Sequence, residues 1–514
     1  MKRLKNFKIL TLIGIASVIV VLLFFARING YPVPPPNSAL FIPLAINFAA
    51  GNGLTDELSH VVSQINTERA GGPRLATSYP PLYPVLMSIL MPTANAWGAF
   101  IAMAIIESLI VVLTAWLLWK AIRMGREGEV DWLDVLIVGF ALFAVIAPLL
   151  TFNSTRTELV FQLFSLLWLI LALRFSNSKH LSKLFGLILG IGGAIHPMHA
   201  IYFSLLIGLF FSFKLGIKPA IREILKAYLL GLGVFLFIMA ITPNSIADKI
   251  SGTLAHARLY GYGFLPGSST QSDVSIAAYG KNLFLYLVTS PSSFFWGPFV
   301  VLLASLALRS YKNFVQQIKS RLLFFLYLLL FLTIVAGIAL GHSDSTYYLT
   351  MFGSLFFILS AYIISKEKRG VLRLLLLMLF VVMSISSVRI FALAPSYLSR
   401  GVTLGEAREL YKGLNLPDCE NCIGISPSSL WALSENYRSM MTYFEAKNAG
   451  KKLGEEVEVI LLGQQWSGRT EPPEEFSGCL LEKDYFAKGT PPKILGFKIA
   501  NIVPGHGFAA YRCK

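Results

Sequence analysis

Charged residues are scarce in this sequence. Asp, Glu, Lys and Arg together make up 14% of its 514 residues, whereas soluble globular proteins carry about 25%. Hydrophobic residues make up 55% of the chain. No Walker loop, no glycine-rich dinucleotide loop after a strand and no zinc-protease helix stands out. These features exclude a soluble globular protein, give no support to a nucleotide-driven mechanism, and indicate a polytopic membrane protein.

Acidic residues are scarcer than basic ones, and the imbalance is local. The net charge is +16, but residues 391–514 hold 14 Lys and Arg against 14 Asp and Glu. The remaining 30 basic and 14 acidic residues lie in 1–390, where most of the basic ones fall in short loops between apolar segments. Such a distribution is a topology signal, with basic loops in the cytoplasm, so we discard nucleic-acid binding.

Cysteine is absent from the first 418 residues. The four cysteines, at 419, 422, 479 and 513, all follow the last apolar segment. Clustered cysteines in one polar region indicate disulfides in an oxidising compartment, although four cysteines allow three pairings. A Cys-x-x-Cys metal or redox site at Cys419 and Cys422 is the alternative.

Apolar runs and the basic loops between them predict a bundle of about eleven transmembrane helices in residues 1–390. The first run could be a signal peptide, but no clear cleavage site follows, so we interpret it as a retained helix with its N-terminus in the cytoplasm. The run 184–213 has basic residues at both ends and is interrupted at His196-Pro197, so we divide it into two helices that meet outside. The expected runs are 9–26, 97–119, 135–151, 159–173, 184–213, 227–241, 294–308, 322–340, 347–364 and 374–390.

Two large outer loops follow from this topology, at 27–96 and 242–292. In the first loop, apolar residues recur at helical spacing, which predicts an amphipathic helix at the membrane interface. They are Leu40, Phe41, Leu44, Ala45 and Phe48. We expect the glycines at 51 and 53 to end this helix, and the chain to re-enter the membrane at the Tyr-Pro-Pro cluster that begins at Tyr79.

Residues 391–514 have the pattern of a small extracytoplasmic α/β or α+β domain. The segment 429–450 has the pattern of an amphipathic helix, and the segments 456–463, 493–503 and 507–513 have the pattern of strands.

Polar side chains that fall at the outer face are the candidates for function, because polar groups at membrane depth are costly and usually functional. Structural alternatives exist: Glu158 can cap a helix start, His196 can cap a broken helix, and the loop cations can form a solvated face. We expect Glu107, inside the second span, to have a partner and to serve packing. The outer-face candidates are Asp56, Glu57, Tyr79, Tyr83, Arg156, Glu158, His196, Lys249, His256, Arg258, His342 and Asp344.

Five motifs occur in a fixed order: PNSALFIPLAINFAAGNGL and YPPLYPVLMSIL in the first loop, STRTELVFQLF, AIHPMHAIYF, and STYYLTMFGSLFFIL. This order resembles the C-type membrane glycosyltransferases that use polyprenyl-phosphate sugars. The dolichyl-phosphate-mannose protein mannosyltransferases and the lipid A aminoarabinose transferases belong to that superfamily. The resemblance covers most of the chain. It implies an inverting glycosyltransferase in the cell (inner) membrane that moves a sugar from a polyprenyl-phosphate carrier to a glycan, lipid or protein outside the cytoplasm.

The resemblance also suggests roles for the outer-face candidates. The expected catalytic acids are Glu158, Asp56 and Glu57, and Glu158 is also a candidate ligand for Mg²⁺ or Mn²⁺. The donor phosphate would be bound by Arg156, His196, Lys249, His256 and Arg258, and the substrates by Tyr79, Tyr83, His342 and Asp344. One departure stands out, because the family's acid just after the first span falls at Asn37 or Ser38 here, and neither is a general base.

Two other functions remain open. Because the family acid is missing, one alternative is a non-catalytic protein that binds lipid-linked glycan or scaffolds an assembly. A transporter of a lipid-linked solute should show repeated broken helices, and the sequence has one broken segment without a second copy.

Overall fold

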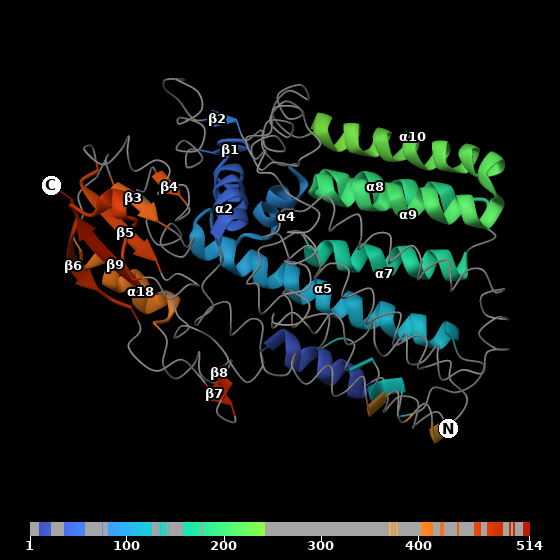
Figure 1. Ribbon diagram of the computed structural model, residues 1–514, viewed down its shortest axis with the longest axis horizontal. Helices are drawn as coiled ribbons and strands as arrows, with labels where there is room; N and C mark the ends of the chain where they lie inside the picture. The colour runs from blue at the N-terminus through green and yellow to red at the C-terminus, as the bar shows by residue number, and fades with distance from the viewer. Residues whose placement is uncertain are drawn as a thin grey trace, which may run out of the picture.

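The computed structural model describes the chain in separate stretches. These are residues 10–21, 35–56, 74–75, 81–125, 158–175, 178–241, 402–414, 422–425, 439–441, 457–463, 470–486, 493–494, 497–498 and 507–513, with scattered positions in 132–142 and 370–378. Most of them form helices, and a small mixed sheet follows near the C-terminus (Figure 1). Predictions for the other residues lie outside the described part of the chain.

The first outer loop begins with the helix that the sequence predicts. Helix α2 spans Pro35–Ala49, and Phe41, Leu44 and Ala45 are buried on it. The chain then turns through Gly51 and Gly53, whose φ angles are +84° and +76°, a conformation that glycine adopts without strain. The short strands β1 (Thr55–Asp56) and β2 (Arg74–Leu75) pair antiparallel, and α4 (Leu82–Leu90) follows directly after the Tyr-Pro-Pro cluster.

Five long helices form the bundle that Figure 1 shows: α5 (Ala96–Gly125), α7 (Glu158–Arg174), α8 (Leu181–Ile195), α9 (Pro197–Leu215) and α10 (Ile217–Ile241). Each overlaps a predicted span, and α10 begins ten residues earlier than the apolar run 227–241. Within the described helices, Trp97–Lys120 and Ile217–Ile241 are long and apolar enough to cross a membrane. The predicted total of eleven spans stays a prediction.

The predicted break between α8 and α9 is confirmed at His196. Pro197 has no backbone N–H, and its ring crowds the carbonyl four residues earlier, so α8 cannot continue through it. His196 adopts an extended conformation (φ −156°, ψ 134°), as residues before proline prefer. Pro197 then opens α9, where a missing N–H costs nothing.

Glycines let α8 and α10 approach each other closely. A Cβ atom on Gly190 would lie 2.5 Å from the carbonyl oxygen of Gly231, and one on Gly186 would lie 2.7 Å from that of Ala227. Gly186 and Gly190 are four residues apart, as are Ala227 and Gly231, so each pair lies on one side of its helix. This is the small-residue packing by which membrane helices associate.

The C-terminal region holds a five-stranded sheet in the order β4-β3-β5-β9-β6. Strands β4, β3 and β5 are parallel, and β9 joins β5 and β6 antiparallel. The bounds are Cys422–Ile425 for β3, Ser439–Met441 for β4, Val459–Gly463 for β5, Leu480–Asp484 for β6 and Phe508–Arg512 for β9. The region also contains helix α18 (Leu404–Lys412) and the 3-10 turn η2 (Glu474–Phe476).

The two faces of this sheet belong to two separate clusters of buried side chains. Val459 and Leu461 pack in one cluster with Ala407 of α18, and that cluster also contains the bundle core. Ile460 and Leu462 pack in the other cluster with Phe476. The alternation follows from the period of two along a strand.

Two sequence-based predictions for this region need correction. The helix predicted over 429–450 is wrong at Ser439–Met441, which form strand β4 beside β3. The single strand predicted over 493–503 is divided into β7 (Lys493–Ile494) and β8 (Phe497–Lys498), which pair with each other. The predicted strands in 456–463 and 507–513 are confirmed as β5 and β9.

The disulfide chemistry expected of this region is confirmed for two cysteines. Cys479 and Cys513 are joined by a disulfide. This bond ties the start of β6 to the end of β9 at one edge of the sheet. Cys419 lies outside the described residues, so the Cys-x-x-Cys alternative stays untested.

Candidate functional site

One end of the bundle gathers elements from several predicted outer segments. Figure 1 shows α2, α4 and the start of α5 at the same end as the start of α7 and the break between α8 and α9. Helix α4 contacts both α2 and α8, so the first loop and the broken segment are in direct contact. We call this the helix-break end. The start of α7 and the break between α8 and α9 lie at the same end because the chain reverses direction between successive helices.

The structure describes the side chains of two predicted site residues, Tyr83 and His196. Glu158 is the first residue of α7 and Asp56 lies in β1, and for both the description extends to the backbone. The other predicted site residues lie outside the described part of the chain: Glu57, Tyr79, Arg156, Lys249, His256, Arg258, His342 and Asp344.

Tyr83 connects the two helices of the first loop. Its side chain is 2% exposed, and its ring meets that of Phe41 edge to face with 5.2 Å between centroids. Aromatic pairs of this geometry contribute about 0.5–1.5 kcal/mol beyond the burial of their area. The visible role of Tyr83 is therefore to hold α4 against α2, and its predicted contact with substrate stays a prediction.

His196 has a second histidine beside it that sequence reasoning did not single out. The rings of His196 and His199 lie 5.5 Å apart between centroids, and both side chains are buried. His199 sits in the first turn of α9, and its backbone N–H donates to the carbonyl of His196. The signal was present in the sequence, because the pattern His-Pro-Met-His puts two histidines three residues apart across a helix start.

His199 is fully buried, yet neither of its ring nitrogens has a hydrogen-bond partner among the described residues. The rings of His199 and Phe161 are 5.2 Å apart, and Gly192 leaves the space in which the side chains of His199 and Phe203 lie. Buried polar groups are normally paired, so an orphaned imidazole calls for an explanation.

Phe161 relates His199 to the start of α7. It lies three residues after Glu158, which is one helical turn, so the backbone of Glu158 begins the helix whose first turn packs beside the histidine pair. Glu158 and His196 are far apart in the sequence and belong to successive predicted outer turns. They nevertheless lie at the ends of neighbouring helices.

Within the stretches that the structure describes, no group of three or more His, Cys, Asp or Glu side chains converges on a point. The described residues thus supply no complete ligand set for the divalent cation considered at Glu158. Glu107 is 1% exposed inside α5 and does have an interaction partner, as expected of a buried acid.

Together these features define a fold class. A bundle of apolar helices with an amphipathic helix in its first loop, a break at His196-Pro197 and a small mixed sheet after the bundle resembles the fold of the C-type membrane glycosyltransferases. Its composition and its fold make the chain a membrane protein.

A solved structure shares this fold. The chain matches ArnT from Cupriavidus metallidurans bound to undecaprenyl phosphate with a TM-score of 0.50 and 10% identity, covering 88% of this chain and 93% of that one. The apo state of the same ArnT gives 0.49 and 12%, with 88% and 92% covered. The Archaeoglobus fulgidus oligosaccharyltransferase tethered to an acceptor peptide gives 0.47 and 11%, with 92% and 72% covered. No protein-family model and no curated protein matches the sequence.

Proposed function

We propose that this protein is a membrane glycosyltransferase that moves a sugar from a polyprenyl-phosphate carrier to a glycan, lipid or protein acceptor outside the cytoplasm. The observation that carries the proposal is the fold, which is shared along most of its length with an ArnT structure that holds undecaprenyl phosphate. The helix-break end supports it, because a buried histidine pair lies there beside the start of α7.

The chemistry requires few groups. A lipid-phosphate sugar already carries a good leaving group, so the protein must hold the phosphate with cations, place the acceptor and remove one proton. His196, directly before α9, suits the phosphate, because the dipole of a helix start also attracts anions. Arg156, Lys249, His256 and Arg258 are the further cations that we assign to it.

Glu158 is the acid that we expect to accept the acceptor's proton, with Asp56 and Glu57 as the alternatives. Glu158 opens α7, and Asp56 lies in β1 of the first loop. Tyr79, His342 and Asp344 complete the proposed substrate contacts. If a divalent cation binds, Glu158 is the residue on which its site would be built, and no step of the proposed reaction depends on it.

A second candidate is a protein that binds lipid-linked glycan without turnover. The observation that favours it is the missing family acid, since the corresponding position falls at Asn37 or Ser38, and both residues lie in the first turn of α2. An amide and a hydroxyl can hold a sugar but do not accept a proton near neutral pH.

The test is transfer from a panel of radiolabelled polyprenyl-phosphate sugars by the purified protein, with cell-envelope extract as acceptor. We expect Glu158→Gln to lower the rate at least a hundredfold, the usual contribution of a general base, while the donor still binds. Asp56→Asn, run in parallel, shows whether the first loop supplies the base instead.

Glu409→Gln is the matched control, because Glu409 is an exposed acid of α18 that pairs with Lys412. It should keep the wild-type rate. Saturable donor binding with no transfer for any sugar would overturn the enzyme and favour the binding protein. Transfer that survives both Glu158→Gln and Asp56→Asn would overturn the assignment of the base.

A further inference from the structure

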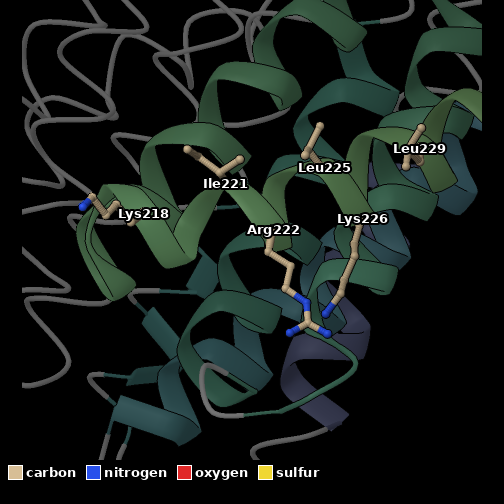
Figure 2. A pocket seen from close by; sticks show the side chains of 6 residues that line it. All are labelled: Lys218, Ile221, Arg222, Leu225, Lys226 and Leu229. Carbon is tan, nitrogen blue, oxygen red and sulfur yellow. The ribbon is translucent and has the colours of Figure 1, made fainter.

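The first half of α10 carries an open groove on its outer surface. The groove has a volume of about 520 Å³ and is lined by Lys218, Ile221, Arg222, Leu225, Lys226 and Leu229. Figure 2 shows that the side chains of Arg222 and Lys226 extend to one side of the helix, and those of Ile221, Leu225 and Leu229 to another. The groove thus has a basic edge and an aliphatic edge that run together along one helix.

This face of α10 points away from the protein. Ala220, Ala227 and Gly231 form the buried side of the helix, which packs on α8. At 100° per residue, Lys218, Leu225 and Leu229 fall on the opposite side. Leu225 and Leu229 are 52% and 68% exposed, so the groove lies on an exposed side of α10.

The basic edge carries more positive charge than the helix neutralises. Between Ile217 and Ile241 the sequence has three basic residues and one acid, Glu223. Glu223 pairs with Lys226 at 2.5 Å. The helix contains no further acid to balance the charges of Lys218 and Arg222. Like charges four residues apart destabilise a helix, and Lys218, Arg222 and Lys226 follow each other at that spacing. An anion against this edge would remove the repulsion.

The position of the basic edge along the helix identifies the kind of anion. The 15 residues from Ala227 to Ile241 carry no charge and rise about 22 Å, most of the thickness of a hydrocarbon core of about 30 Å. Lys226 and Arg222 therefore lie where the core gives way to lipid phosphates, which long basic side chains reach by extending outward. Past Leu229, the exposed Leu232 and Leu236 continue the aliphatic surface into the core.

We propose that this groove binds an anionic phospholipid of the surrounding membrane. The lipid phosphate lies against Lys218, Arg222 and Lys226, and an acyl chain follows Ile221, Leu225 and Leu229. The site is at the opposite end of the bundle from the helix-break end, because α10 begins where α9 ends (Figure 1). It is therefore separate from the proposed donor site, and it does not depend on the protein being an enzyme.

The test is native mass spectrometry of the full-length protein in detergent, titrated with phosphatidylglycerol or with phosphatidylcholine. We expect the wild type to retain phosphatidylglycerol selectively. The double variant Lys218→Gln/Arg222→Gln should bind it at least tenfold more weakly, with phosphatidylcholine binding unchanged.

Lys179→Gln/Lys183→Gln is the matched control. Both lysines are exposed near the start of α8, at the same end of the bundle, and neither lines the groove. The control should keep phosphatidylglycerol binding within twofold of wild type. An equal loss in both double variants, or a loss in neither, would overturn the proposal. Tighter binding of polyprenyl phosphate than of phosphatidylglycerol, lost with Arg222→Gln, would also overturn it. If the double variant does not fold, phosphatidylglycerol binding is measured for Arg222→Gln instead.

Discussion

Among single residues, His199 conflicts most with a purely structural role. A buried polar group without a hydrogen bond costs about 1–3 kcal/mol of stability, and both ring nitrogens of His199 are in that state among the described residues. A residue kept at such a cost and placed beside His196 is expected to serve the site. We expect it to position His196 or to meet the donor phosphate once that is bound.

His199→Leu tests this role, because leucine has a similar volume and no polar atom. We expect the apparent melting temperature to rise, because the unpaired imidazole is removed, and the rate of sugar transfer to fall at least tenfold. His180→Gln, which alters an exposed histidine just before α8, should change neither. A stabilised His199→Leu protein with wild-type transfer would mean that the imidazole has no part in the reaction.

The sequence predicted the break at His196 but not the histidine pair. The break follows from local chemistry, because Pro197 cannot continue a helix and the flanking basic residues require a reversal. The pattern His-Pro-Met-His encodes the spacing of His196 and His199, whereas the packing of His199 against Phe161 of α7 depends on tertiary contacts that no local pattern encodes. The prediction that Glu107 has a partner followed from the high cost of a lone acid in a membrane.

Among elements, helix α8, which ends at the break, packs closely against α10. A Cβ atom on Gly190 would meet a backbone oxygen and the Cβ atom of Val234 at 2.5 and 2.7 Å, and neither atom can rotate away. The helices would have to separate. This would also move His196, which lies six residues after Gly190 and directly follows α8.

Gly190→Ala is therefore expected to destabilise the protein by about 1–3 kcal/mol, as overpacking does, despite the better helix propensity of alanine. Gly233→Ala in α10 is the control, because a Cβ atom there meets nothing within 4 Å. Its apparent melting temperature in detergent should equal or exceed that of the wild type. Equal values for the two variants would contradict close packing of α8 on α10.

Local patterns predicted helices better than they predicted the small sheet. The α18 helix was missed, although Thr403 and Glu406 form a complete capping box that the sequence displays. Strand β4 was mistaken for part of a helix because Ser439–Met441 is a short strand whose partner, β3, lies in another segment. Parallel pairing of this kind is decided by tertiary contacts, which override local propensity.

For the whole molecule, composition was sufficient to predict a membrane bundle followed by a small α/β region, and the order of motifs was sufficient to predict the fold class. The structure adds that α2, α4, the start of α7 and the α8–α9 break share one end of the bundle (Figure 1). This agrees with the predicted topology, in which all four belong to the outer side. The number of spans and the domain boundary at residue 390 stay predictions.

The proposed function requires a polyprenyl phosphate to bind at the helix-break end. Photo-crosslinking of the purified protein with a polyprenyl phosphate that carries a diazirine near its phosphate, followed by peptide mapping, tests it directly. We predict crosslinks in the segments around Tyr83 and around His196 to Phe203, reduced by His196→Gln and by excess unlabelled lipid. Crosslinks confined to Lys218–Leu229 of α10, or spread evenly over the apolar helices, would contradict binding at the helix-break end.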